Sequence, residues 1–130
     1  MMRLATMAQL LEAEPLSQRW NSELEVEFGA AADLMSDVLS LAKPGSVLVT
    51  GLTNPQVIRT SEVAEVAAIV LVRGKQPLLE TTAMAMEAGI PLFATALTMF
   101  ETCGRLYGAG MKPTSSSYRT ITETDASRRG

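Results

Sequence analysis

The amino-acid sequence predicts a single small α/β domain of three layers, in which helices cover both faces of a mostly parallel sheet. Between residues 46 and 108, short apolar runs alternate with helical patterns. Such short connections through helices imply parallel strands and right-handed crossovers. The chain has 130 residues, which suits one domain. Apolar residues make up 47% of the chain, which is enough for a hydrophobic core.

The N-terminal part of this domain is predicted to hold a helix and an edge strand. Apolar residues recur at helical spacing over residues 4–13, and Pro15 ends that helix. Leu24, Val26 and Phe28 then alternate with glutamates, the pattern of a strand with one wet face. The acidic face favours an edge position, because charge there discourages further strand pairing.

A helix and a buried strand come next. Apolar residues from Leu34 onward repeat near helical spacing, Asp33 is positioned to cap the helix, and the Pro-Gly pair at 44–45 ends it. Residues 46–51 read Ser-Val-Leu-Val-Thr-Gly, a short apolar run that is typical of a buried strand.

The following helix and strand are predicted from their boundaries. Asn54 and Pro55 suit the N-cap and the first position of a helix that runs to about residue 67. Residues 69–72 follow without a polar break, as expected for a central strand covered on both faces. Gly74 closes this strand.

The remaining elements are predicted to be a helix, a strand and a helix, over residues 77–88, 90–95 and 98–108. Gly89 lies just past the end of the first helix, where glycine is favoured. Thr98 and Glu101 have the spacing of a capping box, in which each side chain accepts a hydrogen bond from the other residue's amide.

The charge differs between the predicted domain, residues 1–111, and a C-terminal tail, residues 112–130. The domain holds seven Lys or Arg and twelve Asp or Glu, whereas the tail holds four and two. An acidic domain argues against a nucleic-acid surface, because phosphate contacts need clustered Lys and Arg. The tail is rich in Ser and Thr and poor in apolar residues, so it is expected to be disordered and flexible.

The residue types restrict the chemistry. The chain has no histidine, which removes the commonest general base and metal ligand. Cys103 is the only cysteine, so we expect neither a metal site nor an internal disulfide, and a reducing cytoplasm suits the chain. Neither a P-loop nor a GxGxxG fingerprint is present, and no apolar run reaches the ~18 residues that a membrane span needs. The sequence predicts no catalysis and no cofactor.

Polar residues follow each of the three predicted parallel strands, whose carboxyl ends meet at one edge of a sheet. Thr50 and Gly51, Arg73 and Gly74, and Thr95 would gather at that edge, where open α/β sheets collect ligands. Arg73 is the best anion partner, because its planar guanidinium can pair with two oxygens. The alternative is that Arg73 is an exposed charge that merely bounds a strand.

The turn after residue 50 offers a second anion position. Thr53 and Asn54 precede the first amides of a helix, where the helix dipole also favours a phosphate. The alternative, which we favour, is that Gly51 makes the turn and Asn54 caps the helix.

A group of acids in the preceding helix is a further candidate. Asp33, Ser36 and Asp37 would share one helical face, where two carboxylates and a hydroxyl hold a cation or a ligand hydroxyl. The alternative, again favoured, is an N-cap followed by first-turn acids that stabilise the helix dipole.

The helix over residues 77–88 is rich in alanine and methionine and has little polar surface. Such residues suit a packed contact, and an apolar helix on a small sheet has more apolar faces than one core covers. We therefore expect a homodimer through this helix, with Phe100 and Tyr107 of the last helix joining the contact. The alternative is packing against the sheet alone. Cys103 is expected to be an inert core thiol.

The run of elements resembles the DRTGG domain family over roughly residues 20–108. The resemblance lies in local patterns at residues 33–38, at Thr50-Gly51, at 72–74, at 88–92 and at Thr95. The name-giving Asp-Arg-Thr-Gly-Gly is absent. The resemblance implies a fold similar to the N-terminal domains of HPr kinase/phosphorylase and of the MurF ligase. It also implies an accessory module associated with regulation and self-assembly, like those found beside CBS pairs.

The sequence therefore predicts a non-catalytic regulatory or scaffold module that self-associates and senses a small anionic ligand, such as a nucleotide or a phosphorylated metabolite. One alternative is a purely structural adaptor whose partner protein is a kinase, a phosphatase or a redox enzyme. A small phosphotransfer enzyme is less favoured, because the chain lacks histidine and a P-loop.

Overall fold

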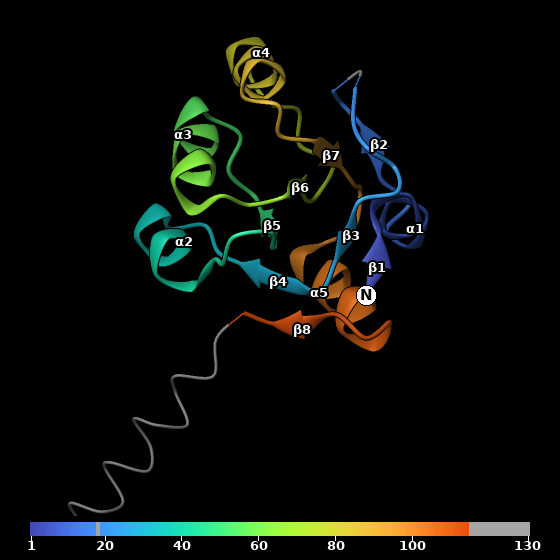
Figure 1. Cartoon of the computed structure of the whole chain (residues 1–130). Coiled ribbons are helices and arrows are strands. Elements are labelled where there is room, and N and C mark those ends of the chain that lie inside the picture. The colour runs from blue at the N-terminus through green and yellow to red at the C-terminus, as the bar shows by residue number, and fades with distance from the viewer. Residues whose placement is uncertain (18, 115–130) are drawn as a thin grey trace, which may run out of the picture.

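A six-stranded sheet forms the middle layer of the protein (Figure 1). The computed structural model describes residues 1–17 and 19–114. The strands of the sheet are β2 (Glu14–Pro15), β4 (Phe28–Ala31), β5 (Val47–Thr50), β6 (Ala68–Leu71), β7 (Leu92–Ala94) and β8 (Lys112–Pro113). They lie in the order β2-β7-β6-β5-β4-β8, and every neighbouring pair is parallel except β2 and β7.

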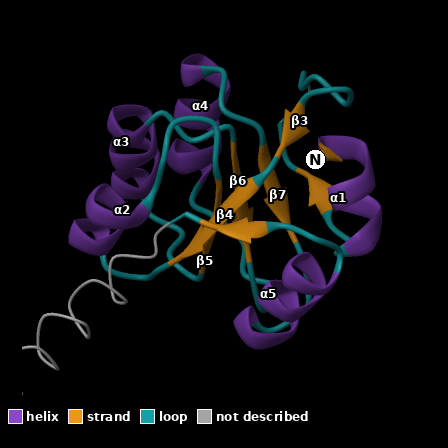
Figure 2. Ribbon diagram, turned by 60° about the horizontal axis from the view of Figure 1, so that its bottom comes forward, coloured by secondary structure: helices purple, strands orange, loops and turns teal. Residues whose placement is uncertain are grey.

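Helices cover both faces of this sheet, which confirms the predicted three-layer α/β/α fold (Figure 2). The helices are α1 (Leu4–Leu10), α2 (Met35–Leu41), α3 (Pro55–Ala64), α4 (Leu79–Ala88) and α5 (Met99–Gly108). α2, α3 and α4 lie on one face, and α1 and α5 lie on the other. Two short strands, β1 (Met2–Arg3) and β3 (Glu25–Val26), form a separate antiparallel pair. Within the described part of the chain, no helix is long and apolar enough to cross a bilayer.

The central strands divide the core in two because successive side chains of a strand point to opposite faces. Val47 and Val49 of β5 pack in the cluster that includes α1 and α5, whereas Leu48 packs in the cluster that includes α2, α3 and α4. Every residue of β5 and β6 is buried. This confirms the buried strand predicted at residues 46–51 and agrees with the central strand predicted at residues 69–72.

The prediction of an acidic edge strand over residues 24–28 was only partly confirmed. Glu25–Val26 form β3, which pairs with β1 alone and has Val26 buried and Glu25 exposed, but the strand does not extend to Phe28. Val26 belongs to β3, outside the main sheet, and Phe28 begins β4, which lies between β5 and β8. After Phe28, β4 consists of glycine and alanine only. The alternation of apolar and polar residues that indicates a strand is therefore absent from it. The packing explains why residue 29 is a glycine, because a Cβ atom there would lie 2.8 Å from the sulfur of Met111.

Several predicted boundaries shift because non-glycine residues take left-handed backbone conformations. The first helix ends at Leu10 and not at residue 13, and Glu12 has φ +51°. Helix α3 ends at Ala64 and not near residue 67, because Glu65 has φ +57°. Asn54 caps α3 as predicted, with its Oδ1 accepting from Gln56 N at 3.0 Å.

The sheet continues past residue 111, where the sequence predicted the end of the domain. Lys112–Pro113 form β8, and Lys112 N donates to Glu27 O at 2.9 Å. Lys112 Nζ also pairs with the Glu27 carboxylate at 3.2 Å. The rest of the predicted tail, residues 115–130, lies outside the described residues.

The expected joint contact of α4 with Phe100 and Tyr107 was wrong. Both aromatic residues are exposed on α5, but α5 lies on the opposite face of the sheet from α4. One continuous patch therefore cannot include them together with α4. Sequence patterns do not reveal this, because they do not say which face of a sheet a crossover helix covers.

Candidate functional site

The carboxyl ends of β5, β6 and β7 meet at one edge of the sheet. Thr50 pairs in register with Leu71, and Leu71 with Ala94. Thr50, Arg73 and Thr95 therefore end or follow three adjacent parallel strands, as the sequence predicted. Whether a ligand binds at this edge stays a prediction.

A fourth parallel strand adds Asp33 to this edge. β4 pairs with β5, and Asp33 follows the end of β4 by two residues. Asp33 Oδ1 accepts hydrogen bonds from Gly51 N at 2.7 Å and from Thr50 Oγ1 at 3.1 Å. Sequence reasoning missed this role because it did not recognise β4. The available signal was an acid just after a strand, in the position that Arg73 takes after β6.

The prediction that Asp33 caps α2 was wrong. The N-cap residue is Leu34, and it makes no side-chain cap. Because Asp33 lies before the helix, it does not share a helical face with Ser36 and Asp37, which are both exposed on α2. Asp37 does lie in the first turn, where an acid favours the helix dipole. Within the described ranges, no cluster of three potential metal ligands occurs.

The turn between β5 and α3 uses its amides internally. Gly51 N bonds to Asp33, and Leu52 N donates to Thr50 Oγ1 at 3.2 Å. The carbonyl of Thr53 accepts from Thr81 Oγ1 at 2.8 Å, which ties the turn to α4. With Asn54 capping and a proline at the first helical position, these contacts favour a structural turn over a phosphate cradle.

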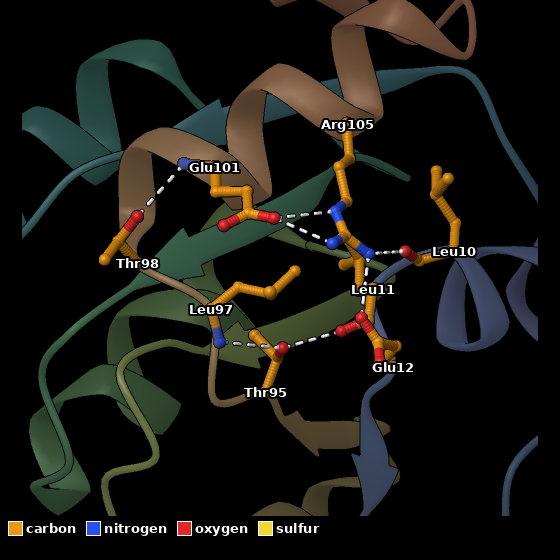
Figure 3. Close-up of polar contacts among 8 residues, drawn as sticks. All are labelled: Leu10, Leu11, Glu12, Thr95, Leu97, Thr98, Glu101 and Arg105. Atoms are coloured by element: carbon orange, nitrogen blue, oxygen red, sulfur yellow. Dashed lines mark hydrogen bonds and ion pairs between the residues drawn. The ribbon is translucent and has the colours of Figure 1, made fainter.

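Thr95 also has a structural role (Figure 3). It is only 2% exposed. Its hydroxyl donates to Leu11 O at 2.6 Å and accepts from Leu97 N at 3.2 Å. Thr95 therefore joins the end of β7 to the segment after α1, and its hydroxyl is not available to a ligand. The Thr50 hydroxyl is engaged in the same way.

Arg105 holds α5 to the end of α1 (Figure 3). Its guanidinium donates to Leu10 O at 2.9 Å, to Glu12 Oε2 at 3.0 Å and to Glu101 Oε2 at 2.7 Å. The hydrogen bonds to Glu101 and then to Glu12 raise the pKa of Arg105. Because the Glu101 carboxylate bonds Arg105, only half of the predicted capping box is confirmed: Thr98 Oγ1 accepts from Glu101 N at 3.2 Å.

Arg73 differs from Arg105 in that its side chain has no partner among the residues that the structure describes. Among the described residues, its guanidinium makes no hydrogen bond and no ion pair, and the residue is exposed. Its backbone has φ +65°, a left-handed conformation that costs about 1–2 kcal/mol for a side chain other than glycine. Hydrogen bonds from Arg73 N to Leu97 O and from Gly74 N to Thr95 O, both 2.8 Å, hold it there. Such retained strain clusters at functional sites.

The guanidinium of Arg73 lies beside Gly51 and Asp33. A Cβ atom on Gly51 would lie 2.9 Å from Arg73 Nη2 and 3.5 Å from each carboxylate oxygen of Asp33. We call these three residues the strand-end rim. The rim presents one cation, one partly engaged carboxylate and a backbone position without a side chain, a set that suits binding of a small polar molecule.

A hollow of about 120 Å³ lies between α5 and the ends of β4 and β8. Ala31, Tyr107 and Met111 are among its lining residues, and the lining is mostly apolar. Cys103 borders it, and burial raises the pKa of this thiol, which agrees with an unreactive cysteine. The cation in its lining, Lys112, is paired with Glu27, so the hollow suits an apolar group better than an anionic ligand.

These features define a three-layer α/β domain with a parallel sheet and a polar strand-end edge. The fold is similar to the structure of the CBS and DRTGG domains of the regulatory region of Clostridium perfringens pyrophosphatase, complexed with its activator diadenosine tetraphosphate. The TM-score is 0.66 at 14% sequence identity, and the match covers 83% of this chain and 46% of that chain. This likeness concerns the fold alone. No family model and no curated protein matches the chain.

Proposed function

We propose that this protein is a non-catalytic regulatory module that binds a small anionic ligand at the strand-end rim. The observation that carries the proposal is Arg73, which is kept in a strained backbone conformation while its guanidinium pairs with none of the described residues. A guanidinium that is free to do so can pair with two phosphate or carboxylate oxygens. Nucleotides and phosphorylated metabolites are the ligand classes that fit.

Two likenesses support this proposal. The fold is similar to that of a regulatory region complexed with a nucleotide activator, and the sequence patterns resemble the DRTGG family. The rim residues follow β4, β5 and β6, so a ligand there would contact three segments at once. Its mechanism would be a shift toward whichever associated state the ligand binds more tightly.

The rim is better suited to binding than to catalysis. Thr50 and Thr95 are both buried, and their hydroxyls are bonded within the protein, so neither is accessible as a nucleophile. This disfavours the small phosphotransfer enzyme. A structural adaptor for a kinase, phosphatase or redox enzyme remains the alternative, and it predicts no ligand.

A thermal-shift screen tests the ligand. A ligand at 100 times its Kd stabilises a native protein by about 2.7 kcal/mol, so nucleotides or phosphorylated metabolites should raise the melting temperature by several degrees. Arg73→Ala should abolish the shift. Lys75→Ala, which removes a neighbouring exposed cation, should retain it. A screen in which no compound moves the melting temperature would leave the adaptor as the function.

Self-association through α4 is a second part of the proposal. Leu79, Ala83 and Met86 follow one another at helical spacing and are all exposed, with Leu79 91% exposed. An apolar strip of this kind on a surface helix is typical of a protein contact. We propose that a second copy of the chain covers it, giving a homodimer.

We expect Leu79→Glu to weaken self-association at least tenfold, because it would bury a charge without a partner in the contact. The matched control is Phe100→Glu, since Phe100 is also 91% exposed but lies on the opposite layer. Light scattering across a concentration series should show a dimer for the wild type and the control. A wild type that is monomeric at every concentration, or a control that alone dissociates, contradicts the α4 contact.

A further inference from the structure

Gly51 separates two opposite charges at the strand-end rim. The strand order β6-β5-β4 sets the residue after β5 between the residues that follow its two neighbours. The Cβ position of Gly51 is 2.9 Å from Arg73 Nη2 and 3.5 Å from both Asp33 oxygens. A guanidinium and a carboxylate therefore both lie within 3.5 Å of the position that a side chain on Gly51 would take.

The two charges do not form an ion pair, although they lie so close to this shared point. Among the described residues, the cations that form ion pairs are Arg3, Arg105 and Lys112, and their partners are all glutamates. Asp33 Oδ1 is engaged by Gly51 N and Thr50 Oγ1, and Oδ2 receives no hydrogen bond from any described residue. The rim thus has a free cationic donor and a free anionic acceptor.

Resting on the proposed function, we infer that the rim selects a phosphate ester that carries a neighbouring hydroxyl group, such as the ribose phosphate of a nucleotide. The phosphate oxygens pair with Arg73, and the hydroxyl donates to Asp33 Oδ2. An anion without a donor meets the repulsion of the Asp33 carboxylate and gains nothing from its free oxygen. Asp33 is therefore a specificity-determining residue, and Gly51 keeps the space open.

The test compares ribose 5-phosphate with sulfate, a tetrahedral anion that carries no hydroxyl at neutral pH, by isothermal titration calorimetry on the full chain. The wild type should bind ribose 5-phosphate at least tenfold more tightly. Asp33→Asn retains an Oδ1 that accepts from Gly51 N and Thr50 Oγ1 but removes the charge. This variant should bind ribose 5-phosphate about tenfold more weakly, because hydrogen bonds to charged groups are the stronger ones, and it should bind sulfate more tightly.

A second variant tests the space itself. Gly51→Ala would place a methyl group 2.9 Å from Arg73 Nη2, the end of a flexible side chain that can move away. We expect folding to be retained and ribose 5-phosphate binding to fall at least tenfold. The control is Gly104→Ala, since a Cβ there has nothing within 4 Å, and its binding should match the wild type.

The possible outcomes separate the two claims. If neither compound binds and nucleotides also fail, the proposed function itself fails. If both bind equally well through Arg73, or if Asp33→Asn leaves their ratio unchanged, the proposed function stands and the selection for a hydroxylated phosphate ester is overturned.

Discussion

Replacement of Thr95 by valine is expected to lower the free energy of unfolding by about 2–4 kcal/mol while leaving the ligand response intact. Valine has nearly the same shape but no hydroxyl, so Leu11 O and Leu97 N would both lose their partner in a largely buried setting. Each buried polar group left without a partner costs about 1–3 kcal/mol. Urea unfolding followed by the fluorescence of Trp20, the only tryptophan, measures the change.

Trp20 is a suitable reporter because its ring packs edge-on against Phe93 in β7, with 5.0 Å between the ring centroids. Thr95→Ser is the matched control, since it keeps the hydroxyl and both hydrogen bonds. Its loss of stability should be clearly smaller. If Thr95→Val unfolds like the wild type but no longer responds to ligand, Thr95 belongs to the binding site and its structural assignment is wrong.

Replacement of Arg73 by glycine is expected to make the protein more stable and to remove ligand binding. Glycine adopts φ +65° without strain, whereas arginine there costs about 1–2 kcal/mol. The greater freedom of glycine in the unfolded chain offsets part of this gain, which leaves about 0.5–1 kcal/mol, or roughly 2–5 °C in melting temperature. Within residues 1–17 and 19–114, the guanidinium makes no hydrogen bond and no ion pair whose loss would reverse the sign.

Glu65→Gly provides the matched control for this prediction. Glu65 has φ +57° at the end of α3, so its replacement should raise the melting temperature by a similar amount. It lies away from the strand-end rim, so ligand-induced shifts should match those of the wild type. If Arg73→Gly is stabilised and still binds, the strain at Arg73 does not serve a ligand. If it is destabilised, Arg73 contributes to the fold.

The Thr95 and Arg73 substitutions separate polar residues that support the fold from those that serve a ligand. Thr95 and Arg73 follow neighbouring strands and are equally conspicuous in the sequence. In the folded protein, the Thr95 hydroxyl is buried and has two partners, whereas the Arg73 guanidinium is exposed and has none. We therefore expect stability to respond to one residue and binding to the other.

The candidate site was only partly predictable from the sequence. The parallel order of β5, β6 and β7 brought Thr50, Arg73 and Thr95 to one edge, as expected from crossovers through helices. Asp33 was expected to cap a helix but instead bonds the amide of Gly51. The strand that positions it, β4, is built from small residues and has no hydrophobic alternation.

The sequence by itself determined the order and type of the elements from β5 to α5, because apolar periodicity and the Asn54, Thr98 and Gly89 helix signals act over a few residues. Only the tertiary structure decided which polar groups at the strand ends are free. Partners such as Asp33 and Gly51, or Thr95 and Leu11, are far apart along the chain. A hydrogen bond between distant residues depends on how the strands are placed side by side, and it leaves no mark in the local pattern of residues.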